Sequence, residues 1–75
     1  MASIEILEEA KWTLVGFDLT SRYRIVADID RLEEQHRAGK TRRLAGTRHV
    51  YRAQCGNRVV LYHERAGRLT ILVIR

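Results

Sequence analysis

The sequence contains no proline and a single cysteine, and it has no long apolar run. One unpaired cysteine excludes an internal disulfide framework and is typical of a reducing compartment, so we expect a cytoplasmic protein. No segment approaches the roughly 18 apolar residues that a membrane-spanning helix needs. The N-terminus lacks a basic region followed by an apolar run, so no secretory signal peptide is predicted. Residues 1–75 are expected to form one small domain.

Acidic side chains are scarce in the second half of the chain. From Arg37 onward Glu64 is the only acid, against ten basic residues. Residues 1–36 instead carry eight acids and four bases, so the formal charge is −4 in the first part and +9 in the second. The ten basic residues are Arg37, Lys40, Arg42, Arg43, Arg48, Arg52, Arg58, Arg65, Arg68 and Arg75. Folding does not require such a separation, which favours a cationic surface that meets a polyanion, with nucleic acid as the first candidate.

The first half is expected to be mainly helical. Weak alternation predicts a short strand over residues 3–7, and residues 8–15 are expected to form a helix that stops at Gly16. Asp18 or Thr20 can cap a second helix, which is expected to end at Gly39. Along it Ile25, Ile29 and Leu32 recur at helical spacing and predict a buried stripe. The aromatic residues Trp12 and Tyr23 are expected to pack against a sheet.

The second half is expected to contain three strands, over residues 49–55, 58–63 and 68–75. Alternation in the first of them predicts that Tyr51 and Ala53 face the core, while Arg52 and Gln54 face the other way. The predicted fold class is α+β with the order β-α-α-β-β-β. Two antiparallel helices would pack on one face of a small antiparallel sheet.

The last two predicted strands are almost continuously apolar, over residues 59–62 and 69–74. Strands of this kind are usually covered on both faces, and two helices can cover only one. We therefore expect the second face, or the edge of the sheet, to be covered by a partner, by self-association as a homodimer, or by further chain.

Four segments of the second half resemble the RelE/ParE toxin superfamily. They correspond to its loop, its Tyr-Arg strand, its central hairpin and its last strand. The segments are Arg43-Leu44-Ala45-Gly46, Val50-Tyr51-Arg52-Ala53, Gly56-Asn57-Arg58-Val59-Val60-Leu61-Tyr62 and Leu69-Thr70-Ile71-Leu72-Val73-Ile74. The helical half fits the family in length and order but carries no diagnostic motif.

The resemblance implies a toxin of a toxin–antitoxin pair that needs no cofactor. RelE-like members cut messenger RNA on the ribosome without a metal, whereas ParE-like members share the fold and act on DNA gyrase. Both kinds are neutralised by an antitoxin, which we expect here to be an acidic protein. The hairpin is closer to the RelE-like form, so the implied function is a ribosome-associated endoribonuclease that blocks translation.

The resemblance also implies candidate catalytic residues. RelE-like enzymes carry Lys and Arg at alternate strand positions, which correspond here to Arg52 and Gln54. In the hairpin Val59 stands where the family has an active-site Arg, and a one-residue bulge would bring Arg58 to that place. The family's C-terminal tail, with a further Arg and an aromatic residue, has no counterpart, and Arg75 is at best adjacent to it.

Two further sets of residues complete the predicted site. His63 can act as an acid or a base near neutral pH, and His49 is a weaker candidate for the same role. The basic residues expected to contact RNA are Lys40, Arg42, Arg43, Arg48 and Arg75. The three histidines and Cys55 lack the spacing of zinc ligands, so no metal site is predicted, and Cys55 is expected in the core.

Three functions remain open from the sequence. The first is the RelE-like endoribonuclease. The second is a ParE-like toxin that inhibits gyrase without catalysis, or an inactive relative that only binds its antitoxin; the neutral Gln54 and the absent tail favour this reading. The third is a general nucleic-acid-binding module, which the lack of interleaved exposed aromatic residues on the strands disfavours.

Overall fold

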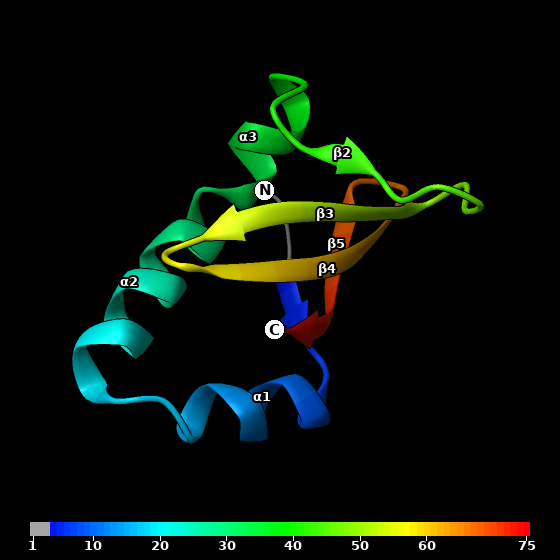
Figure 1. Ribbon diagram of the computed structural model, residues 1–75. Coiled ribbons are helices and arrows are strands. Elements are labelled where there is room, and N and C mark those ends of the chain that lie inside the picture. The colour runs from blue at the N-terminus through cyan, green and yellow to red at the C-terminus, as the bar shows by residue number, and fades with distance from the viewer. Residues whose placement is uncertain (1–3) are drawn as a thin grey trace.

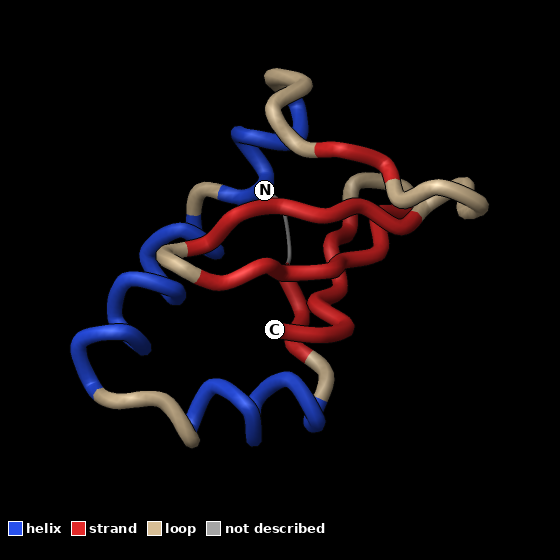
Figure 2. Tube along the Cα trace, in the orientation of Figure 1, coloured by secondary structure: helices blue, strands red, loops and turns tan. Residues whose placement is uncertain are grey.

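A computed structural model of the protein describes residues 4–75. It contains three helices and a five-stranded sheet in the order β1-β5-β4-β3-β2. The elements are β1 (Ile4–Ile6), α1 (Glu8–Val15), α2 (Leu19–Asp30), α3 (Leu32–Arg37), β2 (Arg42–Arg43), β3 (Val50–Cys55), β4 (Arg58–Arg65) and β5 (Arg68–Ile74). The helices lie along one side of the twisted sheet (Figures 1 and 2). The predicted α+β class is confirmed; Ser3, the expected start of the first strand, lies outside the described residues.

The sheet is mixed rather than antiparallel, which corrects the prediction. β1 runs parallel to β5, with Ile4 opposite Leu69 and Ile6 opposite Ile71. The Leu7 N–H continues this ladder by donating to the Ile71 carbonyl at 3.0 Å. The other strands form an antiparallel meander, to which the short β2 adds one strand more than predicted. Parallel and antiparallel pairing use the same apolar residues, so the sequence pattern does not distinguish them.

The expected second helix is two helices, α2 and α3, that meet at Arg31. The Arg31 N–H donates to the Asp28 carbonyl at 3.1 Å, a tight i→i−3 bond that ends α2. The Gln35 N–H then donates to the Arg31 carbonyl at 3.0 Å and starts α3. Leu32 is buried directly after this break, so the apolar stripe continues through it and conceals it. The expected cap is present, because the Asp18 carboxylate accepts from the Ser21 N–H at 3.1 Å. The Ser21 side chain, and secondarily this N–H, lower the pKa of Asp18.

The core lies between the helices and the inner face of β3, β4 and β5. The predicted stripe of Ile25, Ile29 and Leu32 is buried there. The partners of this stripe are Ala10, Leu14, Cys55, Val60, Tyr62, Leu69, Ile71 and Ile74.

The prediction that Trp12 and Tyr23 pack against the sheet is wrong, because they are 70% and 68% exposed. Trp12 lies two positions from both Ala10 and Leu14, which are the buried residues of α1. Two positions correspond to about 200° around a helix, so the indole points away from the sheet. Tyr23 stands in the same relation to Ile25.

The predicted register of β3 is confirmed. Tyr51 and Ala53 pack against the core, and Arg52 and Gln54 are exposed on the other face, called here the open face. On β5 a bulge alters the alternation. Leu61 is opposite Val73 and Tyr62 is opposite Ile71, which leaves Leu72 without a partner. The bulge lets both Ile71 and Ile74 reach the core, which accounts for the continuous apolar run in this strand.

Gly56 and Gly67 provide a test of how the β3–β4 turn packs. Both have positive φ, +61° and +79°, where a side chain is strained. A Cβ at Gly56 would lie 3.3 Å from Ile25 Cγ1, whereas nothing lies within 4 Å of one at Gly67. Gly67→Ala should therefore cost about 1 kcal/mol from backbone strain alone. Gly56→Ala should cost about 1–3 kcal/mol more through overpacking. Equal losses in urea denaturation of the two variants would contradict this packing.

Candidate functional site

Four of the predicted site residues line one hollow on the open face. The hollow has a volume of about 290 Å³ and lies where the chain before β2 leaves the edge of β3. Its walls include Lys40, Arg42, Arg52 and Gln54, completed by Ala53 and Val59. We call it the cationic hollow. Residues on either side of a loop of six residues, 44–49, are thus brought to one place.

The pairing of β2 with β3 explains this arrangement. Arg42 is directly opposite Arg52, and Arg43 is opposite Tyr51. β2 is only two residues long, whereas β3 continues to Cys55. The chain before β2 therefore diverges from the last residues of β3 (Figure 1). The hollow opens there, and Lys40 and Gln54 are among the residues that line it.

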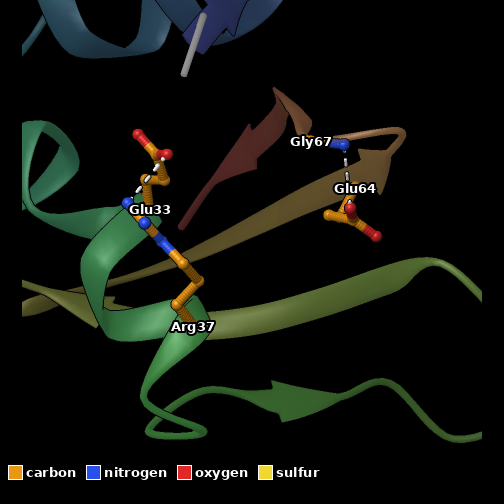
Figure 3. Close-up of polar contacts among 4 residues, drawn as sticks. All are labelled: Glu33, Arg37, Glu64 and Gly67. Carbon is orange, nitrogen blue, oxygen red and sulfur yellow. Dashed lines mark hydrogen bonds and ion pairs between the residues drawn. The ribbon is translucent and has the colours of Figure 1, made fainter. Parts of the chain in front are cut away.

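No acidic side chain lines the cationic hollow. Among residues 4–75 the only ion pair joins Arg37 to Glu33 within α3, at 3.0 Å (Figure 3). Like charges placed directly opposite on neighbouring strands destabilise a sheet. Arg42 and Arg52 are opposite each other and no acid lines the hollow, an arrangement that favours an anion; the planar guanidinium group can bind two oxygens of a phosphate at once.

A second hollow, of about 280 Å³, lies on the helix side of the same strand edge. It shares Lys40, Ala53 and Gln54 with the cationic hollow and is otherwise lined by Asp28, Arg31, Leu32, Gln35, Thr41 and Cys55. The Asp28 carboxylate is already engaged, since its Oδ2 accepts from the Gly56 N–H at 2.5 Å. This second hollow contains an acid as well as basic side chains. The hollow on the open face is therefore the one of the two that favours an anion.

The apolar part of the open face is partly filled by the chain's own side chains. Leu61 is only 8% exposed although it lies outside the helix-side core. A shallow hollow of about 230 Å³ beside it is lined by Leu44, Arg52, Val59 and Arg75. Val73 remains 39% exposed. Coverage of this face by a partner or by self-association stays a prediction, and Arg75 joins Arg52 at its border.

The structure does not bring Arg58 together with Arg52. The two-residue turn sets Cys55 opposite Arg58, so Arg58 faces the helices together with Val60. Its guanidinium lies 4.4 Å from the centroid of the Phe17 ring, a cation–π contact. No bulge occurs in β3–β4 pairing that would return it to the open face.

The remaining predicted residues are dispersed. His63 is opposite Val50 and Thr70 and lies outside the cationic hollow. Its ring is 5.8 Å from that of His49 in an edge-on arrangement, so the two histidines are neighbours. Arg43 and Arg48 are exposed on β2 and on the loop that follows it, and neither lines the cationic hollow.

Sequence reasoning missed a partly buried hydrogen-bond chain beside this site. Tyr62 Oη donates to Thr41 Oγ1 at 2.6 Å and lies 2.7 Å from His36 Nδ1. Tyr62 is fully buried, and this burial raises the pKa of its hydroxyl above the ordinary value. A tyrosine in an apolar strand signals that its hydroxyl needs a buried partner. Nothing in the spacing identifies His36 and Thr41 as those partners.

The chemistry of the site comes from its cations and amides. Among residues 4–75, no group of three or more His, Cys, Asp or Glu side chains is arranged to hold a metal ion.

Cys55 is buried as predicted. No helix in the described part of the chain has the length and apolar character needed to span a bilayer.

Comparisons with protein-family models, with curated proteins and with solved structures gave no significant match.

Cys55 should resist alkylation in the folded protein. Burial, and secondarily the charge of Asp28, raise the pKa of its thiol to about 11. The thiolate is the reactive form, so at pH 7.5 iodoacetamide should modify the native protein far more slowly than the same chain in urea. Mass spectrometry over time would measure both rates, and equally rapid labelling in the two conditions would contradict the buried placement.

Proposed function

We propose that this protein binds RNA through the cationic hollow and is the toxin of a toxin–antitoxin pair. The observation that carries the proposal is the opposition of Arg42 and Arg52, with Lys40 beside them and no acid in the hollow. The order of a strand, helices and a meander also supports it, because it agrees in outline with the RelE/ParE-like order that the sequence suggested. The partners would be an acidic antitoxin, the ribosome and its messenger RNA.

The proposed reaction is metal-independent cleavage of the RNA backbone. The 2′-oxygen attacks phosphorus, the bond to the 5′-oxygen breaks, and the products are a 2′,3′-cyclic phosphate and a 5′-hydroxyl. Arg52 and Arg42 would stabilise the negative charge that develops on the phosphorane, with the Gln54 amide as a further donor. The 2′-hydroxyl loses a proton and the departing 5′-oxygen gains one; His63 would take part in this transfer from outside the hollow, since it projects from the same face of the sheet as Arg52.

A non-enzymatic, ParE-like function is the second candidate. One observation favours it: no imidazole or carboxylate lines the cationic hollow, so proton transfer has no group at the phosphate itself. In that case the basic surface would serve a protein target and the antitoxin rather than RNA.

RNA binding should depend on salt and on Arg52. The logarithm of the association constant should fall with the logarithm of salt by about 0.7 for each phosphate contact with a single strand. Arg52→Ala should weaken binding to all sequences and lower this slope by about 0.7, the contribution of one phosphate contact. Arg65→Ala is the matched control, because Arg65 is exposed at the far end of β4 and lies outside the hollow. Fluorescence anisotropy with a labelled oligonucleotide measures both; equal effects of the two substitutions would remove the hollow from the interface.

Cleavage distinguishes the two candidate functions. If the protein is a nuclease, Arg52→Ala should reduce cleavage by about 10²–10³-fold, the loss typical of one transition-state donor. It should also relieve growth arrest while the melting temperature is retained. Primer extension on messenger RNA from expressing cells should show cuts within codons for the native protein only. Growth arrest without cuts, and unchanged by Arg52→Ala, would favour the gyrase-directed function.

A further inference from the structure

Thr41 connects the cationic hollow to the core. It lies between Lys40 and Arg42 in the sequence, and both neighbours line the hollow. Its hydroxyl accepts a hydrogen bond of 2.6 Å from the hydroxyl of Tyr62, which projects from the inner face of β4. Among the described residues this is the only side-chain hydrogen bond made by residues 40–43. The cationic segment is therefore joined to the buried interior through one hydroxyl pair.

The backbone holds this segment only in part. β2 contributes two residues to the ladder, and Lys40 lies before it, with its N–H donating to the Gln35 carbonyl at 3.0 Å. Lys40, Arg42 and Arg52 carry charges of one sign around a single hollow, and their mutual repulsion favours separation. A tether on Thr41 opposes that separation.

Tyr62 is itself held in place. Its oxygen donates to Thr41 Oγ1 and lies 2.7 Å from His36 Nδ1, a second hydrogen-bond partner. The rings of Tyr51 and Tyr62 stack at 5.5 Å, and the His36 ring packs edge-on against both. A fully buried hydroxyl with two partners has little freedom to move, so it is a rigid anchor for Thr41.

We infer that the chain His36–Tyr62–Thr41 is a positioning element of the cationic hollow. It holds the segment from Lys40 to Arg42 beside Arg52. The positions of these cations then determine how many phosphates the hollow contacts at once. The inference rests on the proposed RNA binding and adds residues that do not touch the RNA. Cationic side chains that are already held in place lose less conformational entropy when RNA binds. This smaller entropy cost is the advantage of such an anchor.

The test is a comparison of two tyrosines. Tyr62→Phe removes the anchoring hydroxyl and keeps the ring, while Tyr51→Phe makes the same change in the stacked neighbour. The Tyr51 hydroxyl makes no side-chain hydrogen bond within residues 4–75. Binding of a single-stranded oligonucleotide is measured by anisotropy over a range of salt concentrations. We expect Tyr62→Phe to weaken binding by about three- to tenfold and to lower the salt slope by about 0.7, as for the loss of one phosphate contact. Tyr51→Phe should leave both unchanged.

Thr41→Val is the second variant, and it decides the question if Tyr62→Phe does not fold. It removes the other half of the hydroxyl pair at a half-buried position and should reproduce the smaller slope. Combined with Tyr62→Phe it should add little further loss, because both changes break the same bond. A merely structural role would change the melting temperature and leave the salt slope intact.

The outcomes separate the two proposals. A native protein whose RNA binding is absent or insensitive to salt would overturn the proposed function. A native protein that binds with a clear slope, while Thr41→Val and folded Tyr62→Phe keep that slope, would overturn the positioning role alone.

Discussion

The register of the β3–β4 hairpin determines which side chains are available for function. A shift of one residue would reverse the faces of one strand relative to the other, either burying Arg52 of β3 or exposing Tyr62 of β4. The turn that fixes the register is held from the helix side. The Asp28 carboxylate accepts from the Gly56 N–H, and Ile25 packs against the same glycine. α2 therefore does more than cover the sheet, because it sets the register that presents Arg52 on the open face.

The same register explains why two arginines on neighbouring strands have different roles. Arg52 projects from the open face beside Arg42, where no acid neutralises it. Arg58 faces the helices and lies over the Phe17 ring, in the corner that Arg22 closes by donating to the Val15 and Phe17 carbonyls. One cation remains free to meet a ligand, while the other stabilises the junction of α1 and α2.

Much of the fold could be predicted from the sequence where one periodicity dominated. Alternation around Tyr51 gave the orientation of β3, and the recurrence of Ile25, Ile29 and Leu32 gave the buried face of the helices. The predictions failed where a local sequence pattern is compatible with more than one backbone structure. The stripe continues through Leu32 and conceals the break at Arg31, and the apolar run around Leu72 conceals the bulge. The hollow brings together Lys40, Arg42, Arg52 and Gln54 only because β2 pairs with β3. The cluster of basic residues in the sequence does not specify that pairing.

The separation of charge along the chain becomes a separation in space. The acids of the first half lie mainly on the helices, as Glu8, Glu9 and Glu34 do, and the cationic hollow lies on the face of the sheet turned away from them. The apolar core separates the helix acids from these arginines, and within residues 4–75 no acid forms an ion pair with Arg42 or Arg52. Repulsion between the opposed Arg42 and Arg52 is therefore not cancelled by an ion pair, and in the proposed positioning role the partly buried Tyr62–Thr41 bond acts against it. The folded core thus holds like charges close together at the surface. Binding of an anionic ligand would reduce the repulsion between them.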